Sequence, residues 1–327
     1  MATPSPPRFS KVLIFGATGE VASAAALEAR ARGATVALAM RDITKTNEWI
    51  TPEAERAAGL RRIAASLDDP EAVGRAARET GAEAAFIYAV RTSDGMRGVL
   101  AALRDAASIR HVVFLSTSQV RSAGAVKDDV RSVPPDHFIP WQHAQVEVAL
   151  QDLGVPHTAL RAGFFASNPL RIYLDKDTRR EVNLLAPEVC HDPIDPADIG
   201  RAAAALLVSP RGGDGGVDGA RDIVYLHGPA LLSQDEQWAV INRELAAAGR
   251  QPVKVNHVTA EQYLANLAAM RVPDAVARSL CRSMVDTRAL YTAEDYEAAR
   301  GNVEMITGRA PTSFEDFVRR EIPRYFD

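Results

Sequence analysis

The stretch KVLIFGATGEVAS, residues 11–23, decides the fold of this chain. Its apolar residues Val12 to Phe15 run directly into Gly16-Ala17-Thr18-Gly19, and a segment rich in small residues begins at Val21. This order predicts a buried parallel strand, a glycine-rich turn and the first turn of a helix. Such a turn directs backbone N–H groups and a helix N-terminus at a phosphate, so the stretch predicts dinucleotide binding.

Strands and helices alternate along the first half of the chain. The apolar runs that predict further strands are residues 35–40, 60–64, 84–90, 111–115 and 157–161. Alternation at this spacing is typical of a doubly wound parallel sheet. The predicted fold class is therefore α/β, with a Rossmann-like doubly wound parallel sheet and a smaller, helix-rich α/β C-terminal substrate domain.

The chain is expected to divide into three regions. Residues 1–10 are rich in Pro and predict a disordered lead-in. Residues 11–162 form the dinucleotide-binding domain, which a return segment near 186–226 rejoins. Residues 163–327 supply most of the substrate-binding part. A second part that leans on the carboxyl ends of the strands would create a cleft beside the cofactor.

Composition and charge narrow the class of protein. The 327 residues carry a formal net charge of -4 and show no basic stripe, so nucleic acid is not an expected partner. The sequence shows no apolar signal core and no apolar run of membrane-spanning length, so we expect a cytoplasmic protein with no membrane partner. Cys190 and Cys281 lack metal-ligand spacing and are expected to be free thiols, and no metal site is expected.

The residues of the turn and of the next strand predict the type of dinucleotide. Gly16 allows the tight turn, Gly19 lets the backbone approach a pyrophosphate, and Ala22 stands where helix and strand pack closely. An acidic residue after the second strand would bind the ribose 2′-hydroxyl of NAD, but Arg41 stands there and suits a 2′-phosphate. We therefore expect NADP(H) in preference to NAD(H). Asp42 leaves a second interpretation open, in which it neutralises Arg41 or binds a ribose.

Further motifs resemble those of one protein family. They are GATG at 16–19, Arg41, SLDDPEAV at 66–73, LSTS at 115–118, His143-x-x-x-Glu147, GVPHTALRAGFFASN at 154–168, PIDPADIG at 193–200, LHGPALLS at 226–233 and MITGRAPTSFEDFV at 305–318. In this order and spacing the chain resembles the NmrA-like family of atypical short-chain dehydrogenase/reductases. The resemblance implies a Rossmann-like domain with a small α/β C-terminal part and an NAD(P)(H) ligand.

The resemblance also implies which residues contact the cofactor. Those expected to touch the dinucleotide are Gly16, Thr18, Gly19, Glu20, Val21, Arg41, Leu67, Ala89 and Val90. Those near the nicotinamide are Ser116, Thr117, Ser118, His143, Ala162, Gly163 and Phe164. The chain departs from the family at Ser66, where relatives commonly carry an acidic residue, and this departure affects the expected adenine contact.

The usual catalytic pair of the superfamily is missing. Short-chain dehydrogenases use Tyr-x-x-x-Lys, in which the Tyr donates a proton to the substrate oxygen. Register against extended relatives places Ile139 and His143 at the Tyr and Lys positions, and Ile139 cannot transfer a proton. His143 has three interpretations: binding of the cofactor ribose, proton transfer, or a structural role. Tyr88, at the end of a predicted strand, is a second catalytic candidate, with core packing as the alternative.

Aromatic residues around the predicted cleft favour a small substrate that is apolar or aromatic. Phe164, Phe165 and Tyr173 follow the sixth strand and are expected to wall the pocket. His137 and Trp141 are further candidates, at the start of a helix that follows a long loop near 119–138. That loop is interpreted either as a lid over the substrate or as a surface excursion.

Three functions are compatible with this pattern. The leading hypothesis is an NADPH-dependent reductase of a mid-sized metabolite from specialised (secondary) metabolism, acting on an imine or iminium, an activated C=C or a quinone. Such acceptors need little help from a Tyr acid. A variant retains the cofactor but catalyses a non-redox cyclisation or isomerisation. The alternative class is an NADP(H)-sensing regulator that binds a protein partner without turnover.

Overall fold

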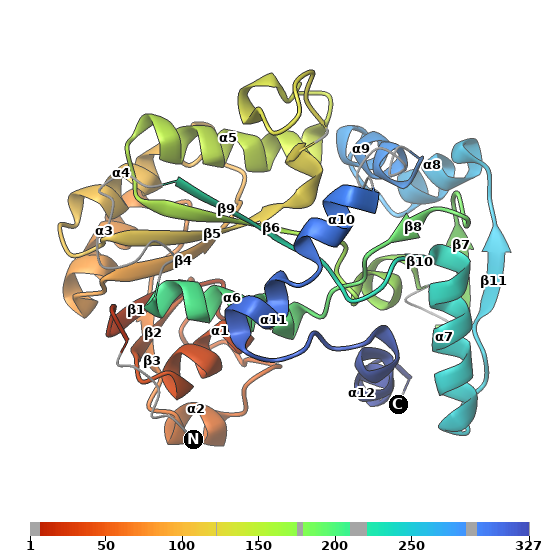
Figure 1. Cartoon of the computed structure of the whole chain (residues 1–327), viewed down its shortest axis with the longest axis horizontal. Helices are drawn as coiled ribbons and strands as arrows, with labels where there is room; N and C mark the ends of the chain where they lie inside the picture. The colour runs from red at the N-terminus through yellow and green to blue at the C-terminus, as the bar shows by residue number, and fades with distance from the viewer. Residues whose placement is uncertain (1–6, 122, 175–178, 210–220, 286–292, 327) are drawn as a thin grey trace.

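The computed structural model describes residues 7–121, 123–174, 179–209, 221–285 and 293–326. At its centre lies a seven-stranded parallel sheet in the order β3-β2-β1-β4-β5-β6-β9 (Figure 1). The strands are β1 (Lys11–Phe15), β2 (Thr35–Met40), β3 (Arg61–Ala64), β4 (Ala84–Tyr88), β5 (His111–Thr117), β6 (His157–Ala162) and β9 (Arg221–Leu226). The predicted α/β class with a Rossmann-like doubly wound parallel sheet is confirmed.

Strand β1 marks the switch point of the sheet. It lies between β2 and β4, and Val12 is in register with Val36 on one side and Ala84 on the other. The chain therefore builds outward first through β2 and β3 and then, in the opposite direction, from β4 onward. Ligands of open parallel sheets bind at such a reversal, outside the carboxyl ends of the strands.

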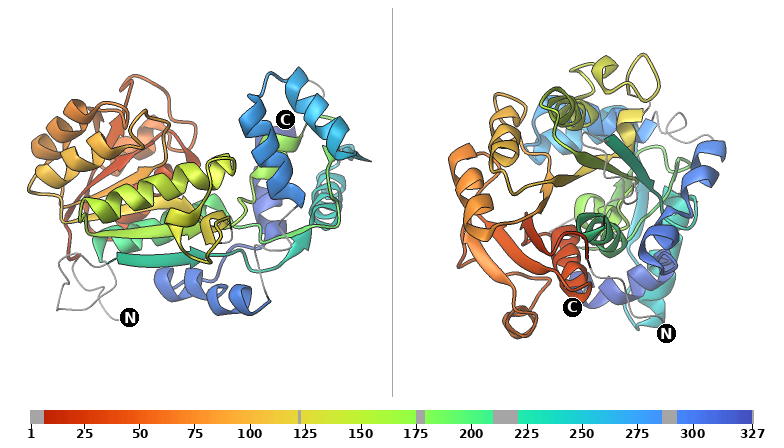
Figure 2. Two further views of the ribbon diagram at one scale, coloured as in Figure 1. Left: turned by 90° about the horizontal axis from the view of Figure 1, so that it is seen from above. Right: turned by 60° about the vertical axis from the view of Figure 1, so that its left-hand side comes forward.

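Helices cover both faces of the sheet (Figure 2). One face carries α1 (Glu20–Ala31) and α6 (Pro196–Val208), and the other carries α3 (Pro70–Thr80), α4 (Arg97–Asp105) and α5 (Phe138–Asp152). Val12 and Ile14 point into the first core, whereas Leu13 and Phe15 point into the second. Because both faces of β1 are buried, its sequence is a continuous apolar run.

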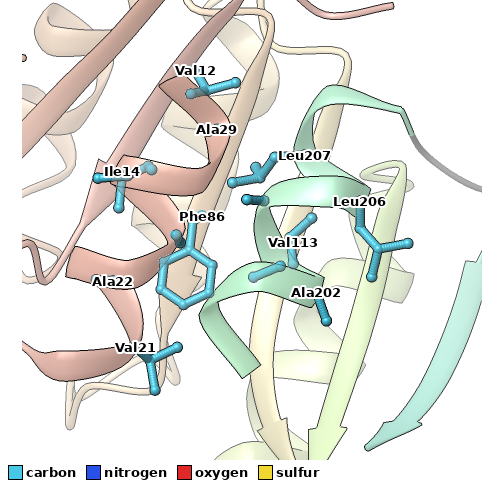
Figure 3. Close-up of a cluster of buried hydrophobic side chains, with 14 of the residues drawn as sticks. Val12, Ile14, Val21, Ala22, Ala29, Phe86, Val113, Ala202, Leu206 and Leu207 are labelled. Carbon is cyan, nitrogen blue, oxygen red and sulfur yellow. The ribbon is translucent and has the colours of Figure 1, made fainter. Parts of the chain in front are cut away.

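Small residues bring α1 and α6 into close contact (Figure 3). Ala22 and Ala29 of α1 and Ala202 of α6 belong to the same buried cluster. A β-carbon on Gly200 would lie 2.5 Å from the carbonyl oxygen of Val21, so this crossing requires glycine. Ala22 therefore occupies a tightly packed position, as its place in the turn motif predicts.

The C-terminal part lies beside the carboxyl ends of the central strands (Figure 1). It contains two small sheets, in which β7 (Glu181–Leu184) pairs with β11 (Lys254–His257) and β8 (Cys190–His191) pairs with β10 (Leu232–Ser233). Its helices are α7 (Gln234–Ala247), α8 (Ala260–Ala269), α9 (Asp274–Val285) and α12 (Phe314–Phe326). Trp238 and Phe317 are fully buried in its main core. The predicted helix-rich α/β character of this region is confirmed.

The chain returns to the sheet twice rather than once. Helix α6 and strand β9 lie within the return segment predicted near 186–226, but β8 inside that range belongs to the C-terminal part. The sequence did not predict the second return, which is α11 (Asn302–Thr307), preceded by α10 (Ala293–Ala299). Val303 of α11 is fully buried in the core formed by α1 and α6.

The start of the described chain is packed against the fold. Residues 1–6 of the predicted lead-in lie outside the described residues. Phe9, also within the predicted 1–10 lead-in, is only 3% exposed, and its N–H donates to the carbonyl of Val208 (3.0 Å). The disorder predicted for the lead-in is therefore wrong at Phe9, because this aromatic side chain completes the core. None of the helices in the described ranges combines the length and apolar character needed to cross a bilayer.

Candidate functional site

The glycine-rich turn joins β1 to α1 at the switch point. Gly16 has a φ of +72°, a conformation that favours glycine. The N–H of Gly19 donates to the carbonyl of Gly16 (2.8 Å) and closes the turn. Gly19 is also the N-cap of α1 and brings no capping side chain, so the first N–H groups of the helix are not satisfied by one. The local geometry is suited to a phosphate, as the sequence predicts for Gly16, Thr18 and Gly19.

The ring of Tyr88 packs over this turn. A β-carbon on Gly16 would lie 2.6 Å from Cε1 of Tyr88. The side chain is 38% exposed and lines two cavities, one beside β2 and β3 and the other beside β4 to β6. Burial raises the pKa of Tyr88, and the charged groups that act on it are Arg41 and Asp68. Tyr88 thus lies between the two cavities. The charges that affect the pKa of its hydroxyl, those of Arg41 and Asp68, lie near β2 and β3.

The first cavity, the β2–β3 cavity, has a volume of about 160 Å³. It is lined by Phe15, Gly16, Ala17, Thr18, Ala39, Met40, Arg41, Asp42, Lys45, Ala65, Ser66, Leu67 and Tyr88. Arg41 and Lys45 give it two cationic side chains. Sequence reasoning missed Lys45, although a second basic residue four positions after Arg41 was the available signal.

Asp42 does not neutralise Arg41. Its Oδ1 accepts hydrogen bonds from the N–H and the hydroxyl of Thr44, at 2.8 and 2.6 Å. These bonds lower the pKa of Asp42 and keep it ionised. No carboxylate of the described chain forms an ion pair with Arg41 within 4.0 Å. The guanidinium therefore remains available to a ligand in the β2–β3 cavity.

Glu20 follows the turn and is buried, with 7% of the residue exposed. Within the described chain neither carboxylate oxygen has a hydrogen-bond partner. Burial, followed by repulsion from Glu321 and Asp195, raises the pKa of Glu20 to about 8. The side chain is therefore mainly neutral at pH 7 and adds little negative charge beside the turn. It also lines a separate cavity of about 560 Å³, together with Arg171 and Arg324.

Four other predicted cofactor contacts are apolar. Leu67 lines the β2–β3 cavity, and Ala89 lines the cavity beside β4 to β6. Val21 is 7% exposed in the α1–α6 core, and Val90 packs against the core of the opposite face. The side chains of Val21 and Val90 therefore serve packing, and the N–H of Val90 donates to the sulfur of Met96 (3.3 Å).

The second cavity, the β4–β6 cavity, has a volume of about 330 Å³. It is lined by Tyr88, Ala89, Leu115, Ser116, Thr117, Ser118, Gln119, Ile139, His143, Ala162, Gly163, Phe164, Phe165, Asn168, His191 and Met284. All residues predicted near the nicotinamide line it. No Asp, Glu, Lys or Arg of the described chain does so. Of the further lining residues, Asn168 follows Phe165 closely in the sequence, whereas His191 and Met284 come from β8 and α9 of the C-terminal part.

His143 lies on α5 one turn after Ile139, and both residues line the β4–β6 cavity. Nδ1 of His143 lies 3.0 Å from the carbonyl oxygen of Ile139. Because that oxygen can only accept, Nδ1 carries the proton, and Nε2 is the acceptor in the neutral ring. Burial lowers the pKa of His143, so the ring is neutral at pH 7. In this state it can accept a hydrogen bond but holds no readily released proton.

Glu147 does not orient His143, although it lies one turn further along α5. Its carboxylate accepts from Nε and Nη2 of Arg161, at 3.1 and 2.7 Å, and from the hydroxyl of Ser116 at 2.6 Å. The Arg161 side chain is fully buried, and that of Glu147 is 1% exposed. Arg161 also donates to Asp128 at 2.9 Å. This buried network fixes the end of β5, where Ser116 lines the cavity.

Two predicted substrate contacts do not reach the β4–β6 cavity. Trp141 packs instead on a small core of Val120, Val130 and neighbouring residues, and His137 is the N-cap position of α5. The long loop before α5 contains two short 3₁₀ turns, Ser118–Arg121 and Val130–Ser132. Val120, Val130 and Val133 are buried, whereas Val126 is exposed. Most of the loop is therefore a packed surface excursion, and the lid interpretation is not supported.

The aromatic wall of the β4–β6 cavity is formed mainly by Phe164 and Phe165. Tyr173 stands behind Phe164, with ring centroids 6.4 Å apart, and its hydroxyl donates to the sulfur of Met284 (3.2 Å). It therefore supports the wall from outside the cavity rather than lining it. Phe164 and Phe165 lie in this cavity wall, and their contact with a substrate stays a prediction.

A buried carboxylate holds the segment after β6 in place. Oδ1 of Asp192 accepts from the N–H of Phe164 (3.0 Å), and Oδ2 lies 2.6 Å from Nδ1 of His227. A β-carbon on Gly163 would overlap the Asp192 carboxylate, so this position requires glycine. The backbone of the cavity wall is thereby tied to the C-terminal part. Among the described residues, no cluster of three or more His, Cys, Asp or Glu side chains is arranged to hold a metal.

The sheet order and the glycine-rich turn at its switch point define an α/β protein of Rossmann-like fold. Among the solved structures it resembles the NADPH-dependent quinone oxidoreductase QOR2 of Escherichia coli, determined in complex with NADPH. The TM-score is 0.67 at 19% identity, covering 94% of this chain and 99% of that one. The model of the NmrA-like family matches residues 8–317, and the chain belongs to this family.

Two curated relatives differ in the roles that their names state. The "Nitrogen metabolite regulation-like protein bik4" of Gibberella fujikuroi is 67% identical over 324 residues, which cover 98% of this chain and 99% of the relative. The "NAD(P)H azoreductase" of Xenophilus azovorans is 26% identical over 311 residues, which cover 94% of this chain and 96% of the relative. Relatives of this chain therefore include a protein named for regulation and one named for reduction.

Proposed function

We propose that the chain binds NADP(H) in preference to NAD(H) across the switch point of the sheet. The support comes from the two cavities on either side of Gly16 and from Arg41 and Lys45 in the β2–β3 cavity. Arg41 interacts electrostatically with Asp68 and Lys45 with Asp42, but in the described chain neither cation forms an ion pair within 4.0 Å. Two such cations at the end of β2 suit a 2′-phosphate better than a 2′-hydroxyl. The near-neutral Glu20 removes a charge that would repel the pyrophosphate.

With this cofactor the protein reduces a neutral, mid-sized, conjugated substrate, either a quinone or an activated C=C. The observation that carries this proposal is the uncharged lining of the β4–β6 cavity at the predicted nicotinamide end. An iminium would enter a cavity without a carboxylate to balance its charge. A neutral acceptor is bound without that electrostatic cost, and the oxygen of a reduced quinone takes its proton from water.

His143 and Tyr88 then have supporting roles. Nε2 of His143 is the acceptor of a neutral imidazole and suits a hydroxyl of the nicotinamide ribose. Tyr88 packs on Gly16, and the charges acting on it belong to Arg41 and Asp68, which favours a contact with the middle of the cofactor. Neither residue needs to release a proton in this scheme.

A second candidate is an NADP(H)-sensing regulator that acts on a protein partner. It is favoured by the name of the 67% identical relative, "Nitrogen metabolite regulation-like protein". Loss of the Tyr-x-x-x-Lys pair at Ile139 and His143 fits this role as well as it fits a reductase.

The absorbance of NADPH during incubation with a panel of quinones, enones and imines distinguishes the candidates. We expect oxidation with quinones or enones, and a lower rate in His143→Ala because its nicotinamide ribose is less well held. Absence of oxidation with every acceptor, together with equal affinity for NADPH and NADP⁺, would support the regulator. Conversion of an acceptor without NADPH oxidation would indicate a non-redox catalyst.

A further inference from the structure

His191 faces the β4–β6 cavity from the short strand β8. It is 2% exposed, and within the described chain neither Nδ1 nor Nε2 has a hydrogen-bond partner. A neutral imidazole offers one donor and one acceptor, and leaving both unused in a buried position is destabilising. Ser116, another buried polar residue of the cavity, differs because its hydroxyl is already bonded to Glu147. The unused atoms of His191 therefore point to a ligand.

The surroundings of His191 hold its ring in place. The ring stacks on Phe164, with centroids 4.2 Å apart and planes inclined by 27°. The backbone is fixed because His191 pairs with Leu232 of β10. The carboxylate of Asp192 is occupied by the N–H of Phe164 and by His227. A fixed ring whose neighbours are otherwise engaged is pre-organised to bind a third group.

The charge state of His191 favours recognition over acid catalysis. Burial lowers the pKa of His191 to about 4, although the nearby Asp192 carboxylate acts in the opposite direction. The ring is therefore neutral at pH 7 and donates through a single N–H. No charged side chain of the described residues lines the cavity to compete for that N–H.

We propose that His191 is a specificity-determining residue, which donates a hydrogen bond to the carbonyl oxygen of a neutral, conjugated ligand in the β4–β6 cavity. Phe164 and Phe165 supply apolar surface for the remainder of that ligand. This inference rests on the proposed function for the class of substrate, and it adds the residue that selects an oxygen-bearing ring. It also explains why a strand of only two residues, β8, carries a buried histidine into an otherwise uncharged cavity.

A pair of probes that differ only in their oxygens tests the proposal. The first probe is 2,3-dimethyl-1,4-naphthoquinone, whose substituted ring carbons resist addition of the exposed Cys190 thiol. The second is 2,3-dimethylnaphthalene, which has the same two rings and no carbonyl. Binding of each is measured in the presence of NADP⁺, so that no turnover occurs.

The variant His191→Phe retains an aromatic ring but removes both polar atoms. We expect it to weaken binding of the quinone by about 3- to 10-fold, the effect of one lost hydrogen bond, and to leave binding of the hydrocarbon unchanged. His257→Phe is the matched control, because His257 is exposed on β11 and does not line the cavity. The affinity for NADP⁺ is expected to be unchanged in both variants.

A measurement on the unsubstituted protein avoids any folding defect of the variant. In ¹⁵N NMR spectra of histidine-labelled protein, the quinone is expected to shift a ring nitrogen signal of His191, which is assigned by its loss in His191→Gln. The hydrocarbon is expected to leave this signal in place. A purely structural histidine would respond equally to both probes.

The outcomes separate this inference from the proposed function. Equal quinone affinity in the unsubstituted protein and His191→Phe, with normal NADPH oxidation, overturns the role of His191 and leaves the reductase intact. Selective loss of quinone affinity in His191→Phe, with no NADPH oxidation by any acceptor of the panel in either protein, supports the His191 contact and overturns the reductase. If the quinone does not bind the unsubstituted protein with NADP⁺ in place, the role of His191 is rejected, and the panel of acceptors alone decides the reductase.

Discussion

Tyr88 lies against Gly16 so closely that a β-carbon on the glycine would be 2.6 Å from Cε1 of the ring. Gly16 directly follows β1, Tyr88 ends the neighbouring strand β4, and the two residues meet at the switch point of the sheet. Since Tyr88 lines both the β2–β3 and the β4–β6 cavities, this contact lies between the two halves of the proposed cofactor site.

The substitution Gly16→Ala tests this relationship. We expect NADPH affinity to fall by at least about tenfold, because the new methyl group strains the left-handed backbone and displaces the Tyr88 ring. Gly59→Ala is the matched control: Gly59 has a φ of +64°, but a β-carbon there meets nothing within 4 Å. The control should lose stability and retain cofactor affinity. Equal NADPH affinity in Gly16→Ala and the unsubstituted protein would contradict the proposed site.

The cations of the β2–β3 cavity should set the preference for the phosphorylated cofactor. We expect Arg41→Ala and Lys45→Ala each to weaken NADPH binding by about tenfold or more, since each removes a charge-assisted hydrogen bond. Binding of NADH should hardly change. Fluorescence titration with both cofactors measures the difference, with Arg75→Ala on the exposed face of α3 as the control. Equal losses for NADH and NADPH would show that these residues do not contact a 2′-phosphate.

The buried pair of Glu147 and Arg161 should dominate the stability of the site. We expect Glu147→Gln to lower the free energy of unfolding by about 3 kcal/mol, because the buried Arg161 charge then keeps only the partly exposed Asp128 as an ionised partner. The double substitution Glu147→Leu/Arg161→Met should be less destabilising, since no unpaired charge remains. Chemical denaturation measures both. Glu53→Gln breaks an exposed pair with Arg56 and is expected to cost less than about 1 kcal/mol; a similar loss in both single variants would refute the argument.

Glu20 should make stability depend on pH in an unusual direction. Its pKa is raised from 4.5 to about 8 in the folded state, so its contribution is fully present below pH 4.5 and is lost as the pH rises through 8. We therefore expect Glu20→Gln to be more stable than the unsubstituted protein at pH 9, by on the order of 2 kcal/mol, and to show a smaller difference at pH 5. Thermal unfolding across this range measures the effect. Parallel pH curves for the two proteins would show that Glu20 titrates normally.

Local patterns predicted the parts of the fold that depend on neighbouring residues. The apolar run of β1, the glycines of the turn and the alternation of strands and helices depend on backbone geometry and burial within a few residues. They can therefore be recognised in the sequence. That Ile139 and His143 line the same cavity could also be predicted, because residues four apart share one face of a helix.

The errors arose where distant segments decide the outcome. Trp141 lies two residues after Ile139, on a different side of α5, and helical geometry alone argued against placing both in one cavity. The strand that carries His191 has only two residues, and His191 pairs with Leu232, which is far along the chain. No local sequence pattern predicts such a pairing. The Pro-rich neighbours of Phe9 predict disorder, but Phe9 is held in place by its contact with Val208, which is distant in the sequence.

The interleaved path of the chain also limits how the ligand preference of the β4–β6 cavity could change. The chain leaves the sheet after β6, returns in α6 and β9, leaves again toward α7, and returns once more in α11 before it ends in α12. The C-terminal part is therefore not a module that could be exchanged as one contiguous block, and no single hinge could swing it open. New substrate preferences in such an architecture must arise by individual substitutions at the cavity wall, with the scaffold kept whole.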